Sequence, residues 1–281
     1  MFVLKKPLLG GLLICILAAI LVANIHYEVV PIRFFYGSNN GLNFRVLSFN
    51  VHSEAEGFIS SSQKIAKMIM EEKPDFVFLT EYYEGTDETL QIVLEQHYPY
   101  MDRKYRWGTN EGDAFYSQWQ IDSVSRIKLP NHFSAIYRAQ IHKGIDTLTM
   151  FCCHLSSNNM KLENGKLASL REGRILRSIE ADTLAMVLRR EKYPVIVMGD
   201  MNDVAGSSPV KKIKSVGLTD AWWKGGCGYG STYHDGWIKL RIDYVFYDDQ
   251  QLKLKTVDVV GEKEWSDHRA IVARFDLENN I

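Results

Sequence analysis

Hydrophobic residues form one unbroken run near the N-terminus. Residues 7–25 are 19 consecutive uncharged residues, mostly Leu, Ile, Ala and Val, and Lys5 and Lys6 precede them. At 1.5 Å per residue, a helix of this length spans about 28 Å, close to the ~30 Å hydrocarbon core of a bilayer. The run predicts a single transmembrane helix, and the two lysines predict that the rest of the chain lies on the non-cytoplasmic side.

Two other interpretations of this run stay open. A cleaved signal peptide has the same charge layout, and a helix buried in a soluble core has the same hydropathy. Cleavage after Ala19 or Ala23 would leave Leu17 or Leu21 at the −3 position, where a small residue is typical. We therefore prefer a retained anchor, with residues 1–40 as anchor and connector and residues 41–281 as one globular domain.

Short apolar strands alternate with amphipathic helices in residues 41–281. Strands are expected at 44–50, 76–79, 195–198, 242–247 and 270–275, with further antiparallel strands inside 105–127 and 133–153. Helices are expected from a cap at 60–62 to Pro74, over 86–97 and over 167–190, with a short one capped at 207–208. Hairpin-like pairs mixed with alternating strands and helices predict an α/β fold, a layered sandwich of two mixed β-sheets flanked by helices.

Composition narrows the class of protein. The chain is 46% hydrophobic, 12% aromatic and 24% charged, which excludes a disordered, collagenous or coiled-coil protein. A net charge of −1 argues against holding nucleic acid by bulk electrostatics. The four cysteines have no CxxC or Cys/His ligand spacing, so we expect neither a disulfide framework nor a structural zinc site.

Polar residues that can carry chemistry stand where apolar strands stop or start. Four of them end a strand and the others open one: Asn50, Glu81, His154 and Asp200, then Asp243 and the pair Asp267-His268. Strand ends from separate strands can share one rim, and crowded carboxylates repel unless a cation neutralises them. Oxygen ligands suit a hard ion such as Mg²⁺ or Mn²⁺.

Six short segments occur in an order that resembles a known superfamily. They are SFNVH (48–52), LTEY (79–82), CHL (153–155), GDMND (199–203), RIDYVF (241–246) and SDHRAIV (266–272). Together they resemble the endonuclease/exonuclease/phosphatase superfamily, which includes exonuclease III, DNase I, neutral sphingomyelinases and inositol-phosphate phosphatases. The resemblance covers about residues 44–276 and makes residues 41–281 the catalytic domain.

The resemblance implies a role for each matching residue. Glu81 would be the direct Mg²⁺ ligand, with Asn50 beside it and Asp267 near a metal. Asp200 and Asn202 would orient or deprotonate the attacking water and contact the scissile phosphate. The carboxylate of Asp243 would orient His268 and favour its protonated form, and His154 would contact phosphate.

Each role has a structural alternative. His154 is alternatively a satisfied structural histidine, Asp243 a partner of Arg241, and Asn202 part of a turn. Asp203 is assigned a structural role only. The arginines of the long helix are assigned to a solvated face, and the alternative is that one of them reaches a phosphate: Arg171, Arg174 and Arg177.

The chain is therefore expected to be a membrane-anchored, Mg²⁺- or Mn²⁺-dependent phosphoesterase that attacks a phosphodiester or phosphomonoester with metal-activated water. A lipid head group, an inositol phosphate and a nucleic acid all stay open as substrates, and no protein partner is inferred. The alternatives are an endo- or exonuclease and a catalytically inactive binding module. Thr80, where many relatives carry Gln, and residues 114–119 depart from the family pattern and leave specificity open.

Overall fold

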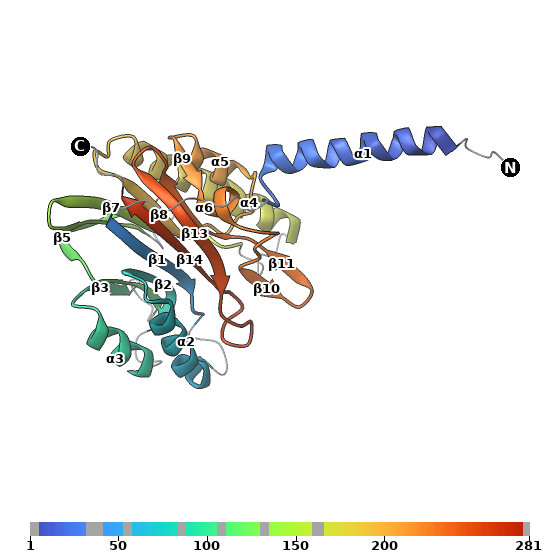
Figure 1. Ribbon diagram of the computed structural model, residues 1–281. Coiled ribbons are helices and arrows are strands. Elements are labelled where there is room, and N and C mark those ends of the chain that lie inside the picture. The colour runs from blue at the N-terminus through green and yellow to red at the C-terminus, as the bar shows by residue number, and fades with distance from the viewer. Residues whose placement is uncertain are drawn as a thin grey trace.

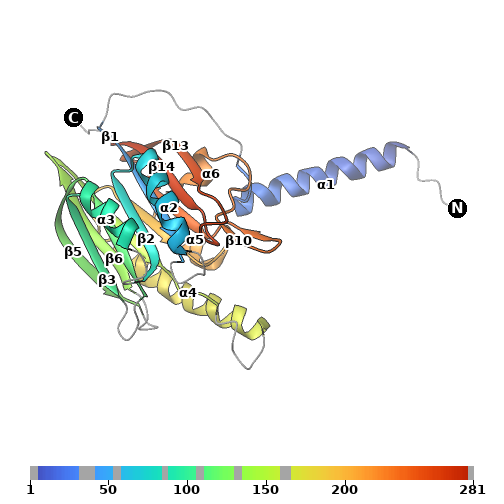
Figure 2. The same ribbon diagram turned by 90° about the horizontal axis from the view of Figure 1, so that it is seen from below.

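Two six-stranded β-sheets stack face to face and form the body of the protein (Figures 1 and 2). The computed structural model describes residues 6–31, 42–52, 58–83, 88–105, 111–129, 135–158 and 166–277. Lys5, residues 32–41 of the connector and the first two residues of the helix expected at 86–97 lie outside this part. Each sheet contains one parallel pair among antiparallel neighbours, so the prediction of two mixed sheets is confirmed.

The first sheet has the order β13-β14-β1-β2-β4-β3, and the second has the order β5-β6-β7-β8-β12-β9. The strands of the first are β1 (Leu42–Asn50), β2 (Phe76–Tyr83), β3 (Tyr100–Tyr105), β4 (Glu111–Ser117), β13 (Leu252–Val260) and β14 (Ala270–Leu277). Those of the second are β5 (Gln120–Lys128), β6 (Ala135–Lys143), β7 (Asp146–His154), β8 (Val195–Asp200), β9 (Leu218–Asp220) and β12 (Asp243–Asp248). A separate hairpin joins β10 (Tyr233–Asp235) to β11 (Ile238–Leu240).

Alternating side chains build three apolar layers. On β2, Phe76 and Phe78 enter the core between the sheets, whereas Val77 and Leu79 enter the layer beneath the helices α2 (Phe58–Glu72) and α3 (Glu88–His97). The second sheet is covered in the same way by α4 (Lys166–Leu188) and α5 (Ser208–Lys214). Strands buried on both faces explain why several of them read as continuous apolar runs.

The helix starts differ in detail from the expected caps. Helix α2 begins at Phe58, and Ser62 uses its hydroxyl inside the helix, where it donates to the carbonyl of Ile59 at 2.9 Å. Ser207 does occupy the N-cap position of α5, but its side chain makes no capping hydrogen bond. The short helix α6 (Ala221–Gly225) is instead capped by Asp220, which accepts from the backbone N–H groups of two tryptophans.

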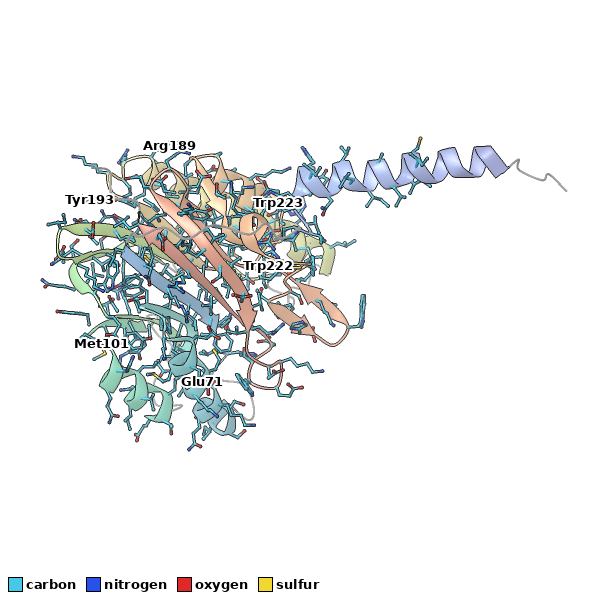
Figure 3. The ribbon with its side chains drawn as sticks, viewed as in Figure 1. Glu71, Met101, Arg189, Tyr193, Trp222 and Trp223 are labelled. Carbon is cyan, nitrogen blue, oxygen red and sulfur yellow. The ribbon has the colours of Figure 1, made fainter. Side chains whose placement is uncertain are left out.

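Of the tryptophans in the C-terminal half of the chain, one is buried and another is exposed. Figure 3 shows Trp222 and Trp223 on α6. Trp222 is buried in the core between the sheets, and its indole N–H donates to the carbonyl of Gly228 at 3.1 Å. Trp237, at the turn of the β10–β11 hairpin, is 90% exposed. Trp222 is therefore a packing residue.

Helix α1 (Lys6–Tyr27) extends away from the sheets (Figure 1). Its domain end is held by Glu28, whose carboxylate pairs with Lys214 and whose carbonyl accepts from Arg241 Nη2 at 3.3 Å. Among the described residues, no helix has the length and apolarity that crossing a membrane requires. The transmembrane helix and the division at residue 40 stay predictions.

Candidate active site

The pairing of strands brings the predicted site residues to one edge of the sandwich. Asn50 ends β1 opposite Thr80 of β2 in a parallel pair, so Glu81 follows directly beside it. In the second sheet Asp200 pairs in register with both His154 and Asp243. Because the sheets are stacked, the two sets meet although Asn50 and Asp200 are 150 residues apart.

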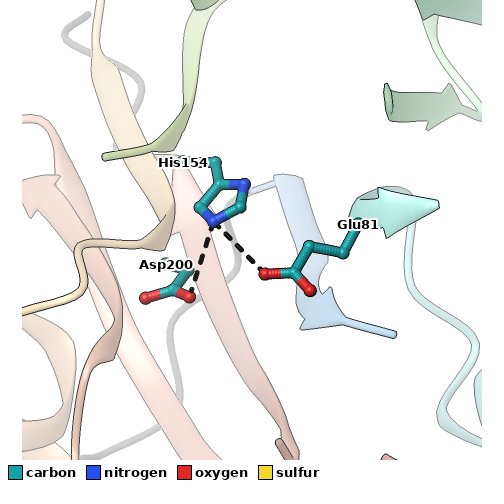
Figure 4. A group of neighbouring side chains, drawn as sticks. All are labelled: Glu81, His154 and Asp200. Carbon is teal, nitrogen blue, oxygen red and sulfur yellow. Dashed lines mark ion pairs between the residues drawn. The ribbon is translucent and has the colours of Figure 1, made fainter. Parts of the chain in front are cut away.

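One carboxylate from each sheet forms the centre of the site (Figure 4). The side-chain amide of Asn50 donates to Glu81 Oε1 at 2.9 Å and to Asp200 Oδ2 at 3.2 Å. His154 Nε2 lies 3.5 Å from Glu81 Oε1 and 3.9 Å from Asp200 Oδ2. His154 therefore lies against the two acids, and not apart from them as a structural histidine would.

His268 approaches Asp200 from the other side. Its Nδ1 lies 2.8 Å from Asp243 Oδ2, which leaves Nε2 facing Asp200 Oδ2 at 3.8 Å. Burial lowers the pKa of His268, but the charge of Asp243 and the hydrogen bond to it outweigh burial and raise that pKa to about 10. Burial, followed by the charge of Asp243, raises the pKa of Asp200 to about 7.

Asp243 does not pair with Arg241, so the structural alternative for this residue is wrong. Arg241 forms a buried ion pair with Asp220, with Nη1 at 2.8 Å from Oδ2. Arg241 lies before β12, which begins at Asp243, and its guanidinium is held by Asp220. This separation leaves the carboxylate of Asp243 to His268.

Unusual backbone geometry aims the central residues. Glu81 has φ of 52° and interrupts the pairing of β2 with β4, where the register shifts between Leu79 and Tyr82. Asn202 has φ of 51°; its backbone N–H donates to Asp200 Oδ1 at 2.7 Å, and its side-chain amide donates to the carbonyl of Leu155 at 2.9 Å. Left-handed backbone of this kind is costly for residues other than glycine and concentrates at functional sites.

Two hydroxyl groups that the sequence pattern did not reveal form hydrogen bonds with the backbone of the site residues. Thr232 Oγ1 accepts from the backbone N–H of Asp243 at 3.1 Å. Ser266 donates to the carbonyl of Asn50 at 2.9 Å and accepts from the N–H of His268 at 3.0 Å. Ser266 lies in the SDHRAIV segment, whereas Thr232 has no local signal because it lies between elements.

Helix α4 contributes a buried arginine, and the expectation of a solvated Arg177 is wrong. Arg171 and Arg174 are exposed as predicted, but only 3% of Arg177 is exposed. Its Nε donates to Asp203 Oδ2 at 3.1 Å, and its Nη1 donates to the carbonyl of Ser156 at 2.9 Å. Arg177 therefore links the loop after β8 to the loop after β7, and Asp203 has the structural role assigned to it.

Asp267 lies beside the central acids with a partner of its own. Its Oδ1 is 3.0 Å from Nδ1 of His52, and the N–H of His52 donates to Asn50 Oδ1 at 3.1 Å. The hydrogen bond to Asp267 raises the pKa of His52. Burial raises the pKa of Asp267, but the bond to His52 and the charge of His268 outweigh burial and lower it. The metal role of Asp267 stays a prediction, and His52 is a neighbour that the sequence pattern did not assign.

The donor atoms at the centre fit a hard divalent cation. One ligand atom each from Glu81, His154 and Asp200 lie within 4.8 Å of one another, and a second such group joins Asp200 to Asp243 and His268. Two carboxylates from different sheets face each other here, which is the oxygen-rich, negatively charged setting that Mg²⁺ and Mn²⁺ prefer. The amide oxygen of Asn50 is occupied by His52, so Glu81 and Asp200 are the residues best placed to hold the ion.

A two-sheet α/β sandwich with carboxylates and histidines gathered at one edge defines the class of protein: an α/β fold of the phosphoester-hydrolase type. The sequence model of the Endonuclease/Exonuclease/phosphatase family matches residues 47–268, and the chain belongs to this family. No curated protein matches the chain significantly.

Solved structures with the same fold share little sequence with the chain. TDP2 from C. elegans is 18% identical with a TM-score of 0.65, covering 85% of this chain and 77% of that one. D. rerio TDP2 complexed with a single-strand DNA product is 16% identical with a TM-score of 0.67, covering 83% and 99%. The human Nocturnin catalytic domain with a bound sulfate anion is 17% identical with a TM-score of 0.65, covering 85% and 96%. Likeness at these identities concerns the fold alone.

Proposed function

We propose that the chain is a divalent-metal-dependent phosphoesterase that hydrolyses its substrate by attack of water. The observation that carries this proposal is the meeting of Glu81, Asp200 and His154 within 4.8 Å, with His268 against the same Asp200. A bound Mg²⁺ or Mn²⁺ would polarise a phosphoryl oxygen and lower the pKa of the attacking water. Glu81 and Asp200 would hold that ion.

The remaining residues have separate tasks in this proposal. His268, with Nδ1 held by Asp243, would donate from Nε2 to a phosphoryl oxygen that gains charge in the transition state. His154 and Asn202 would contact the phosphate from the second sheet. Asn50 would keep Glu81 and Asp200 aligned through its two hydrogen bonds.

The test is a parallel assay of the full chain with Mg²⁺ against plasmid DNA, single-stranded RNA, phospholipid vesicles and inositol phosphates. Glu81→Gln keeps the shape of the side chain and removes its charge, and should reduce turnover by at least about 10²-fold. EDTA should inhibit, and Mg²⁺ or Mn²⁺ should restore activity. Full activity in EDTA would contradict the metal dependence, and an inert protein in every arm would favour the binding module.

Nucleic acid is the second candidate substrate. It is favoured by the solved D. rerio TDP2, which is complexed with single-strand DNA. The net charge of −1 is an argument against it, because nucleic-acid enzymes usually carry a basic surface. Hydrolysis in the plasmid or RNA arm of the assay would identify nucleic acid as the substrate, and hydrolysis only in the phospholipid or inositol-phosphate arm would exclude it.

We also propose that residues 7–25 attach the chain to a membrane, with the catalytic domain on the non-cytoplasmic side. The uncharged run and the preceding lysines support this proposal. Alkaline phosphatase fused after residue 40 should be active, and the chain should stay with membranes in a carbonate wash. A soluble chain that begins near Asn24 would instead show a cleaved signal peptide.

A further inference from the structure

The β10–β11 hairpin is built onto the segment that carries His268. The N–H of Arg269 donates to the carbonyl of Thr232 at 2.6 Å, and the N–H of His234 donates to the carbonyl of Asp267 at 2.7 Å. Tyr233 pairs with His268 in an antiparallel bridge between these bonds. The hairpin therefore keeps a constant position relative to the histidine.

The ring of Tyr233 rests against the imidazole of His268. The ring centroids are 5.0 Å apart and the planes meet at 63°, an edge-to-face arrangement. Asp243 already occupies Nδ1 of His268, and the tyrosine covers part of the ring. Another group can therefore approach Nε2 only from a limited range of directions. Any group that meets Nε2 of His268 also comes near Tyr233.

Tyr233 lies close enough to the acids of the site for their charges to act on its hydroxyl group. Burial raises the pKa of this tyrosine, and so do the charges of Asp267, Asp235, Asp200 and Glu81. Three of these carboxylates belong to the site, so the hydroxyl lies within reach of their fields and keeps its proton. Within the part of the chain that the structure describes, no protein group forms a hydrogen bond with this hydroxyl, and the side chain is only partly buried.

We propose that Tyr233 is a further catalytic residue, which donates its phenolic O–H to an oxygen of the phosphoryl group that His268 contacts. This inference rests on the proposed phosphoesterase function. A neutral donor suits this position, because it adds a hydrogen bond to the oxygens without another charge beside His268. The bond strengthens as negative charge develops on those oxygens in the transition state.

Tyr233→Phe isolates the hydroxyl, because phenylalanine keeps the ring against His268. With bis(p-nitrophenyl) phosphate and Mg²⁺, the full-length variant should lose about 10- to 100-fold in kcat/KM, as expected for a hydrogen bond to a charged group. The loss should fall on kcat more than on KM, since the bond is strongest in the transition state.

Tyr229→Phe is the matched control. It removes the same atom from the same segment, and the charges that Tyr229 affects are those of Arg241 and Tyr244. Its kcat/KM should stay within about twofold of the wild type. Equal losses in the two variants would overturn the inference, because they would show a packing effect of the segment.

Binding of inorganic phosphate in the presence of Mg²⁺, measured by calorimetry, separates this inference from the function on which it rests. Weaker binding by Tyr233→Phe than by the wild type and Tyr229→Phe supports the proposal. Hydrolysis and phosphate binding by Tyr233→Phe at wild-type levels overturn the Tyr233 assignment alone. A wild-type chain that neither hydrolyses the diester nor binds phosphate overturns the proposed function, and the inference with it.

Discussion

Removing the buried guanidinium of Arg177 should destabilise the fold strongly. Arg177→Met keeps most of the aliphatic volume but leaves Asp203, which is 5% exposed, with an unpaired charge in the interior. The arginine also donates to Ser156 at 2.9 Å and to Asn158 Oδ1 at 3.0 Å, so three contacts are lost together. Breaking one partner of a buried ion pair costs about 3–5 kcal/mol of the free energy of unfolding.

This loss translates into a measurable melting shift. For a domain of this size, 1 kcal/mol corresponds to about 2–4 °C, so the melting temperature should fall by about 6–20 °C. Arg174→Met is the matched control, because Arg174 is exposed on the same helix. Its effect should stay within about 0.5 kcal/mol, as is usual for surface substitutions.

Urea and thermal unfolding of the full chain provide the assay, and a double variant sharpens it. Arg177→Met with Asp203→Asn removes both charges but keeps an oxygen to accept from the N–H of Val204. It should therefore be more stable than Arg177→Met alone. If Arg177→Met matched Arg174→Met, or if the double variant were the least stable, the buried ion pair would not stabilise the loops.

Three further predictions follow from the site and its supports. His268→Ala and Asp243→Asn should each lower kcat in steady-state kinetics, by about 10²–10³-fold for His268. The double variant should be little worse than the worse single one. If the two losses multiplied, His268 and Asp243 would not act as one unit. Gly199→Ala should lower stability by about 3 kcal/mol or more, because its Cβ would lie 1.8 Å from the carbonyl oxygen of Cys153; Gly217→Ala, with no atom within 4 Å but also positive φ, is the control in thermal unfolding. In EDTA, the free energy of unfolding should fall as the pH rises from 7 to 10. Protonated His268 stabilises the fold fully below its unfolded pKa of 6.5, and this contribution is lost as the pH rises to the folded-state pKa of about 10. The variant His268→Gln should flatten that slope.

Local patterns predicted most of the elements and the polar residues at or near their ends, but they did not predict β3 or β13. The run FVFL predicts a strand because four apolar residues in a row need burial on both faces, and the structure buries them between a helix layer and the second sheet. Asp200 was found by the same logic and does end β8, whereas β2 continues past Glu81 to Tyr83. By contrast β9, β10 and β11 have three residues each, too few for a period of two to appear.

What the sequence by itself determined was therefore most of the succession of strands and helices, the family and the set of polar groups at or near strand ends. Only the tertiary structure decided how those groups pair: Arg177 is buried against Asp203, Asp267 lies against His52, and Tyr233 packs on His268. Such pairings join residues that are 26, 215 and 35 positions apart. They depend on the stacking of two sheets and on the hairpin joined to one edge. Periodicity along the chain contains no information about either, because it describes only which face of an element is buried.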